Sequence, residues 1–124
     1  MIVGIDVGSQ SLKAVLLDDR LRPAGSGRRS YPIDFPQPGW AEQSPAVWEE
    51  AFGPAIAEAL AAAGRKPGDV TAIGIAGQLD GCIAVDGSGA ALAPIWMAAI
   101  WRRRPAGCCP MHLLARDRCA SISP

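Results

Sequence analysis

The chain has 124 residues, 49% of them apolar and 19% charged, and its 12 basic and 12 acidic side chains give a formal net charge of zero. That length suits one domain, and the apolar content argues against intrinsic disorder. The balanced charge leaves no basic footprint for nucleic acid, and no uncharged apolar run reaches the roughly 18 residues of a membrane span. The first residues also lack the features of a secretory signal, so we expect a cytoplasmic protein.

The neutral total hides an asymmetry along the chain. Residues 1–97 carry a net charge of −4, whereas residues 98–124 carry +4, with five arginines and one aspartate. Three of the four cysteines also fall in this last segment. A composition shift this abrupt marks a boundary. We therefore expect a folded part over residues 1–97 and an atypical, poorly ordered tail over residues 98–124.

The start of the chain predicts a β-hairpin. Residues 2–6 are a β-branched apolar run typical of a buried strand, residues 7–11 are a turn of small residues, and residues 12–17 are a second apolar run. A weak alternation over residues 27–33 favours a third strand. A loop over residues 36–39 follows.

A helix is expected around Pro45. Ser44 is placed to cap its free N–H groups, and Pro45 to occupy its first position, where a missing N–H costs nothing. Gly64 is placed to end the helix, while Pro54 is expected to kink or split it. Apolar side chains at spacing four predict one buried face. They are Trp48, Phe52, Ile56 and Leu60.

The remaining elements follow in short order. Residues 70–76 predict another buried strand, and residues 77–81 a loop between two glycines. A short strand over residues 82–85, a turn over residues 86–89 and a last strand or loop over residues 90–97 come next. The order β-β-β-α-β-β predicts an α/β or α+β layer with one mixed sheet.

A carboxylate followed by a turn of small residues is the first candidate site. Asp6 ends the first strand, and the backbone N–H groups of such a turn can point at a phosphate without steric hindrance. The hydroxyls of Ser9 and Ser11 add donors, and Asp6 can hold a hydrated Mg²⁺. Phosphoryl transfer needs this pairing, because its catalysis is largely positioning and charge neutralisation. The alternative is a plain hairpin, and the pattern is neither a Walker A loop nor a dinucleotide fingerprint.

The glycine-bounded loop over residues 77–81 is the second candidate site. It follows the carboxyl end of a strand, where open α/β sheets place ligands. Gln78 and Asp80 can bind sugar hydroxyls as donor and acceptor. The alternative is a surface turn with two solvated side chains. Residues 38–45 add a turn, an aromatic anchor and a helix start, which by themselves are structural.

Four segments occur in an order that fits one protein family. They are residues 4–18 (GIDVGSQSLKAVLLD), residues 39–45 (GWAEQSP), residues 73–78 (IGIAGQ) and residues 89–96 (GAALAPIW). Together they resemble the N-terminal domain of the FGGY carbohydrate kinases, and within these the xylulokinase-like members. The first segment is similar to the family's opening phosphate motif, and the third to the strand that leads to its sugar site. The resemblance covers residues 1 to about 97.

The resemblance implies part of an actin-like, ribonuclease-H-like N-terminal lobe of the α/β class, with a mixed sheet and one main helix. It implies that ATP and Mg²⁺ are bound and that the γ-phosphate passes to a hydroxyl of a small sugar or polyol. Asp6 is the implied metal ligand. The implied ATP phosphate contacts are Gly8, Ser9, Gln10, Ser11 and Lys13. The implied sugar contacts are Gln78, Leu79, Asp80 and Trp96. The family's general base is expected beyond the last residue, so no catalytic residue is assigned and the chain alone is expected to be inactive.

The sequence departs from the xylulokinase pattern at two places. Xylulokinases usually carry Met-His where this chain has Leu79-Asp80, and a carboxylate there changes which hydroxyls are read. They also tend to have an aspartate and then arginines after the Trp-Met pair, where this chain has AAIWRRR over residues 98–104. Because the resemblance and the composition both change near Met97, we hypothesise a shifted reading frame or a truncation there.

Other classes of protein remain open at this point. One is a non-catalytic actin-like module that binds nucleotide, and another is a non-functional gene remnant. A zinc site in the tail is disfavoured, since adjacent cysteines are poor zinc ligands and no C-x₂-C pair exists. Its candidate ligands are Cys108, Cys109, His112 and Cys119. The sequence predicts no oligomeric state.

Overall fold

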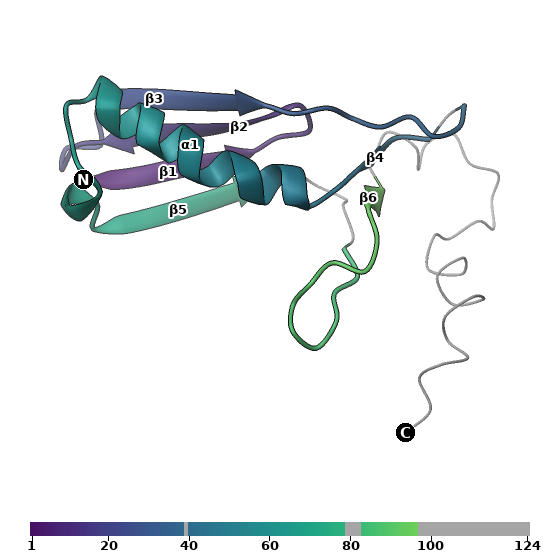
Figure 1. The fold of residues 1–124 in the computed structure, drawn as a ribbon. Coiled ribbons are helices and arrows are strands. Elements are labelled where there is room, and N and C mark those ends of the chain that lie inside the picture. Colours follow the sequence, from purple (N-terminus) through teal and green to yellow (C-terminus); the bar gives the residue numbers. More distant parts are fainter. Residues whose placement is uncertain (39, 79–82, 97–124) are drawn as a thin grey trace.

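The computed structural model describes residues 1–38, 40–78 and 83–96. Its main body is a four-stranded sheet with one long helix lying across one face (Figure 1). A separate pair of very short strands lies beyond the start of the helix. The elements in chain order are β1 (Ile2–Val7), β2 (Ser11–Leu17), β3 (Pro23–Ser30), β4 (Glu42–Gln43), α1 (Ala46–Ala62), the 3₁₀ turn η1 (Pro67–Asp69), β5 (Ala72–Gly77) and β6 (Ile95–Trp96).

The main sheet is mixed, as the sequence predicts. Its strand order is β3-β2-β1-β5, with β1 antiparallel to β2, β2 antiparallel to β3, and β1 parallel to β5. The hairpin of β1 and β2 is confirmed. The third strand spans Pro23–Ser30, so it begins and ends earlier than the alternation over residues 27–33 suggested. β3 contains Gly25 and Gly27, which are unusual in a strand and weaken its pattern in the sequence. The close approach of α1 to β3 requires both of them.

Alternation along β1 and β2 places one set of side chains under α1. Val3, Ile5 and Val7 are buried and face Leu16, Ala14 and Leu12, their register partners on β2. Successive side chains of a strand point to opposite faces. The core therefore lies between α1 and this face of the sheet, and Asp6 lies on the other face.

The helix approaches the sheet closely over β2 and β3. A Cβ added at Gly27 would stand 2.1 Å from the Ala55 carbonyl oxygen, and one at Gly25 would stand 2.3 Å from that of Ala59. Only glycine fits under a helix at this separation. The fully buried positions of α1 are accordingly small, with Ala51, Ala55 and Ala59 beside Leu60.

The predicted stripe of large apolar residues is therefore only partly right. Leu60 is buried, whereas Trp48, Phe52 and Ile56 are partly buried and pack against the edge of the core. The reason is steric, because the glycines of β3 draw α1 so near that only methyl groups fit between them.

Both helix ends can be compared with expectation. The helix begins at Ala46, with Pro45 as the preceding cap and no side-chain capping bond, so the prediction of a Ser44 side-chain cap is wrong. Instead the carbonyl of Ser44 accepts the Val47 N–H at 3.2 Å. The predicted end is confirmed, since Gly64 has φ +61° and Arg65 N–H donates to the Leu60 carbonyl at 2.9 Å. Pro54 is exposed and does not split the helix.

The prediction of a buried strand over residues 70–76 is wrong. β5 is the edge strand of the sheet and all six of its residues are exposed, with Ile73 at 54% and Ile75 at 64%. Both isoleucines belong to the face that α1 covers elsewhere. They are exposed because α1 packs mainly on β2 and β3 and does not cover β5.

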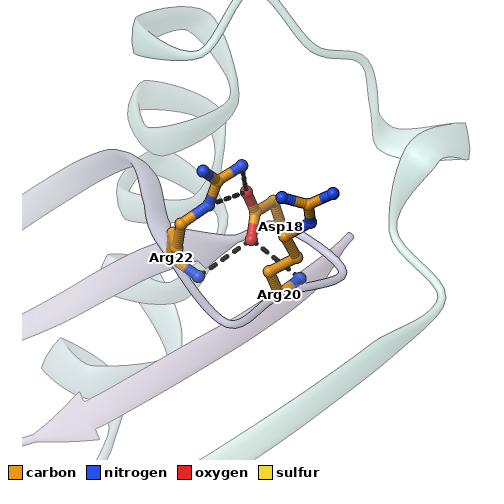
Figure 2. Close-up of polar contacts among 3 residues, drawn as sticks. All are labelled: Asp18, Arg20 and Arg22. Carbon is orange, nitrogen blue, oxygen red and sulfur yellow. Dashed lines mark hydrogen bonds and ion pairs between the residues drawn. The ribbon is translucent and has the colours of Figure 1, made fainter.

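The turn between β2 and β3 is organised by one carboxylate (Figure 2). Asp18 accepts hydrogen bonds from the backbone N–H groups of Arg20 and Arg22, both at 2.9 Å, and from Arg22 Nε at 2.8 Å. These bonds hold the pKa of Asp18 below its ordinary value, with the Arg22 backbone N–H contributing most. Leu21 has φ 58°, which this tight turn requires. The cluster shapes the hairpin, and it lies at the end of the sheet away from residues 8–11.

The last described segment is mostly irregular. The turn over residues 86–89 is confirmed, with Asp86 accepting from the backbone N–H groups of Ser88 at 2.8 Å and Ala90 at 3.0 Å. The short strand predicted over residues 82–85 is reduced, in its described part, to a bridge between Val85 and Ala91. Residues 97–124 lie outside the described part, so the expected tail stays a prediction. No helix of the described residues is long and apolar enough to cross a membrane.

Candidate functional site

The two predicted site segments meet at one end of the sheet. β1 and β5 run parallel, so their carboxyl ends share an edge, and the Gly8–Ser11 turn and Gln78 both follow these ends. The first turn of α1 begins at the same end (Figure 1). Gln78 N–H donates to the Val7 carbonyl at 3.0 Å, which ties the second segment to the first.

The Gly8–Ser11 turn is tight and its carbonyl groups are occupied. Gly8 N–H donates to the Ser11 carbonyl at 3.1 Å, and a Cβ on Gly8 would stand 3.1 Å from that same oxygen. The Gly8 carbonyl accepts the Tyr31 hydroxyl at 2.5 Å, and the Gln10 carbonyl accepts the Tyr31 N–H at 3.1 Å.

The amide N–H groups of Ser9 and Gln10, unlike these carbonyls, are not used in hydrogen bonds among the described residues. Successive free N–H groups of a turn form an anion-binding concavity. Ser9 is partly exposed and Gln10 exposed, whereas Ser11 is buried, so the accessible donors of the turn are its two central residues.

Asp6 and Lys13 lie side by side on the open face of the sheet. They are register partners across β1 and β2, both are exposed, and Arg28 of β3 is the next partner in the same row. Side chains directly opposite on antiparallel strands share a face. Lys13 is therefore placed beside Asp6 and outside the turn itself.

The protein offers few metal ligands at this end. The described residues contain no group of three or more side chains that could hold a metal ion. Mg²⁺ suits such a place, because it keeps several waters and is commonly held by one or two carboxylates together with substrate phosphates. The exposed Asp6, one residue before Val7 and the turn, fits that role.

The predicted sugar contacts are only partly described. Gln78 is partly buried, and its Nε2 is a buried donor with no hydrogen-bond partner among the described residues. The backbone of Trp96 pairs with Glu42 in the β4–β6 ladder. Leu79 and Asp80 lie outside the described residues. The structure therefore brings Gln78 to the turn and leaves the rest of the sugar set as a prediction.

The pKa of Tyr31 is shifted by its surroundings, including Asp6. Its pKa is raised from the ordinary value of 10.0, mainly by burial and further by the Asp6 carboxylate. The phenol is therefore protonated at neutral pH and keeps its bond to the Gly8 carbonyl. On the β3 side of the sheet, the pKa of Glu58 is lowered by the Arg28 backbone N–H and then by the Arg29 side chain, which together join α1 to β3.

Two residues that hold the turn were not predicted as part of the site. Tyr31 stood in a presumed strand, and Gln43 stood in a segment interpreted as structural. Gln43 is fully buried, and its Nε2 donates to the Ser9 carbonyl at 3.0 Å. This contact with Ser9 spans 34 positions of sequence, and no local periodicity encodes it.

Comparison with known proteins agrees with the sheet and with the site at its edge. A family model described as the FGGY family of carbohydrate kinases, N-terminal domain, matches residues 1–111. The chain therefore belongs to the FGGY family of carbohydrate kinases. Its mixed sheet and main helix are part of the actin-like, ribonuclease-H-like α/β fold that the solved structures of this family share.

Individual relatives bear different names. A glycerol kinase from Allorhizobium ampelinum is 36% identical over 118 residues, which cover 94% of this chain and 23% of that protein. A solved xyloylose kinase from Brucella ovis has a TM-score of 0.71 and 34% identity over 77% of this chain and 20% of that one. For a xylulose kinase from Rhodospirillum rubrum the TM-score is 0.69 and the identity 28%, with 78% and 20% covered. The chain thus spans about a fifth of the length of these relatives.

Proposed function

We propose that this chain supplies one wall of the active site of an ATP-dependent sugar kinase. The transferred group is the γ-phosphate of ATP, and the acceptor is a hydroxyl of a small sugar or polyol. The observation that carries the proposal is the pair of free amide N–H groups at Ser9 and Gln10, next to the exposed Asp6. Family membership and relatives named glycerol and xylulose kinase support it.

The nucleotide phosphates are assigned to the Gly8–Ser11 turn. Ser9 and Gln10 offer the accessible backbone N–H groups of this turn, since the Gly8 N–H donates within the turn and Ser11 is buried. Gly8 and Ser11 complete the proposed set on the family pattern. Lys13, on the same face as Asp6, adds a positive charge within the row. Asp6 would hold Mg²⁺, which when bound neutralises charge on the phosphates. The task of the chain here is to hold the phosphate chain in position.

The acceptor is assigned to the loop after β5. Gln78 has a buried amide donor with no acceptor among the described residues, and a substrate hydroxyl would supply one. Leu79, Asp80 and Trp96 complete the proposed set on the family pattern. The xylulokinase-like resemblance assigns a ketose as the acceptor, and glycerol is the alternative, since a solved xyloylose kinase is 34% identical and a glycerol kinase 36% identical. If D-xylulose perturbs the Gln78 side-chain amide more than glycerol does, the assignment is supported; the reverse order would make glycerol the acceptor.

The 124 residues are not proposed to catalyse transfer by themselves. No described residue is assigned as general base, and one wall cannot exclude water from the reacting groups. We expect no sugar-dependent formation of ADP by the purified chain in a coupled assay with pentoses and polyols. Sugar-dependent turnover would show that the chain is a complete catalyst, contrary to this assignment.

Binding of Mg·ATP tests the nucleotide assignment directly. Calorimetric titration should show binding that needs the metal and that weakens in Asp6→Asn. Asp19→Asn is the matched control, because Asp19 is an exposed carboxylate in the β2–β3 turn at the other end of the sheet. Equal affinities in both variants would remove Asp6 from the site. Binding of Mg·ATP without any effect of a sugar would favour a non-catalytic nucleotide-binding module.

A further inference from the structure

Peptide geometry sets the direction in which the Gly8–Ser11 turn can bind. A trans peptide carries its C=O and the following N–H on opposite sides. The carbonyls of Gly8, Ser9 and Gln10 all accept hydrogen bonds from the segments that follow β3. The N–H groups of the next residues in each case therefore face the other way. A group that fixes one of these carbonyls by a hydrogen bond therefore also fixes the direction of the N–H group in the same peptide.

Gln43 is the side chain best placed to do this. It is 0% exposed, and its Nε2 donates both to the Ser9 carbonyl at 3.0 Å and to the Pro32 carbonyl at 2.6 Å. Its Oε1 accepts the indole N–H of Trp48 at 2.7 Å. All three bonds fit one orientation of the amide, since a flipped group would set oxygen against two carbonyls and nitrogen against a donor.

The partners of Gln43 come from parts of the fold that are otherwise separate. Trp48 belongs to the first turns of α1, Pro32 to the loop after β3, and Gln43 itself pairs with Ile95 of β6. The Gly8–Ser11 turn is thus fixed to the helix and to the small β4–β6 sheet through one amide. Buried polar groups of this kind are costly when their partners are lost.

We infer that Gln43 is a positioning residue for nucleotide binding. It holds the Ser9 carbonyl on the protein side, so that the Gln10 amide of the same peptide faces the phosphate. Tyr31 holds the carbonyls of Gly8 and Gln10 in the same way, which directs the amides of Ser9 and Ser11. This inference rests on the proposed nucleotide site. It assigns to the Trp40–Pro45 segment a role in binding as well as in starting the helix.

The test compares two variants of the full chain. Gln43→Met keeps the length of the side chain and removes every hydrogen bond, while Leu16→Ala removes core packing at a buried position of β2. The probe is Mg·ATP, followed through the amide signals of Ser9 and Gln10. Gln43→Met should bind about tenfold more weakly than wild type, equivalent to about 1.4 kcal/mol. Leu16→Ala should lose stability but keep the affinity, a separation that a purely structural role would not produce.

A ligand-free readout separates this inference from the proposed function. The carbonyl ¹³C shift of Ser9 should move in Gln43→Met and stay unchanged in Leu16→Ala. If wild type does not bind Mg·ATP, the nucleotide assignment fails, while a moved Ser9 carbonyl still supports the positioning role. An unmoved Ser9 carbonyl together with unchanged affinity in Gln43→Met overturns the inference.

A second variant covers a failure of Gln43→Met to fold. Trp48→Phe keeps the aromatic packing and removes only the donor to Gln43 Oε1. The amide of Gln43 is then free to rotate, so the Mg·ATP affinity should fall by a smaller factor than in Gln43→Met. Wild-type affinity in Trp48→Phe, with an unchanged Ser9 carbonyl shift, counts against the inference.

Discussion

Single side chains at the carboxyl end of β1 decide which atoms of the Gly8–Ser11 turn are free. Tyr31 and Gln43 occupy its carbonyls, and the exposed Asp6 lies two residues before Gly8. The exposed carboxylate and the short turn could be predicted from the sequence, because both lie within one hairpin. The two anchors could not, since Tyr31 and Gln43 reach the turn across 23 and 34 positions of sequence.

Ionisation of Tyr31 gives a pH-dependent test at this scale. Because burial and Asp6 raise its pKa in the folded state, the neutral form is favoured by folding. That contribution to stability is full below the ordinary value of 10.0 and is lost as pH rises through the folded value. We expect the free energy of unfolding to fall in this alkaline range in wild type, and less steeply in Tyr31→Phe.

The ionisation of Tyr31 can be followed without overlap from other tyrosines, because the chain has one tyrosine. Tyrosinate absorbance therefore reports Tyr31 alone, and the folded chain should titrate at higher pH than the chain in denaturant. A midpoint that is the same in both states would contradict the placement of Tyr31 against Gly8 and near Asp6.

At the scale of elements, the packing of α1 on β3 depends on two glycines. The 2.1 Å approach of a Cβ at Gly27 to the Ala55 carbonyl leaves no room for a methyl group, and the nearby atom is backbone, which cannot turn aside. Gly27→Ala should therefore lower the free energy of unfolding by about 1–3 kcal/mol. Urea denaturation followed by far-UV circular dichroism measures the change.

Gly74→Ala is the matched control for this prediction. Gly74 also lies within a strand, but a Cβ there meets nothing within 4 Å. Its replacement should change stability by a few tenths of a kcal/mol at most. A loss in Gly74→Ala as large as that in Gly27→Ala would show that strand conformation, and not the contact with α1, sets the cost.

The contact between α1 and β3 also separates the features of the helices and strands that the sequence predicts from those that it does not. The hairpin, the helix and its end at Gly64 follow from local periodicity and turn chemistry, and all three are confirmed. The buried face of α1 was assigned to its largest residues, whereas Ala51, Ala55 and Ala59 fill it. That outcome depends on Gly25 and Gly27 of β3, residues that weaken the strand signal in the sequence.

For the molecule as a whole, β5 is the open side of the fold. Among the described residues it is an edge strand that pairs with β1 alone, and it exposes Ile73 and Ile75. It carries no charged side chain or proline, the usual protection of an edge. Burial was expected from its apolar sequence. Such a strand is normally covered by a further layer, and the described residues provide none.

We therefore expect the isolated chain to self-associate through β5. Sedimentation velocity should show species larger than a monomer that increase with concentration, and Ile75→Lys should reduce them by placing a charge on the edge strand. Leu92→Lys is the control, because Leu92 is a similarly exposed apolar residue outside the sheet. Equal reduction by both substitutions would indicate a general effect of charge and would remove β5 from the interface.

The central claim is that the Gly8–Ser11 turn and Asp6 receive the metal-bound phosphates of ATP. Paramagnetic broadening by Mn²⁺·ATP, with Mg²⁺·ATP as the diamagnetic reference, locates the metal on the ¹⁵N-labelled chain. The amide signals of Ser9 and Gln10 should broaden first, while those of Arg20 and Arg22, in the turn at the other end of the sheet, keep their intensity. Uniform broadening, or broadening centred on the β2–β3 turn, would contradict the account.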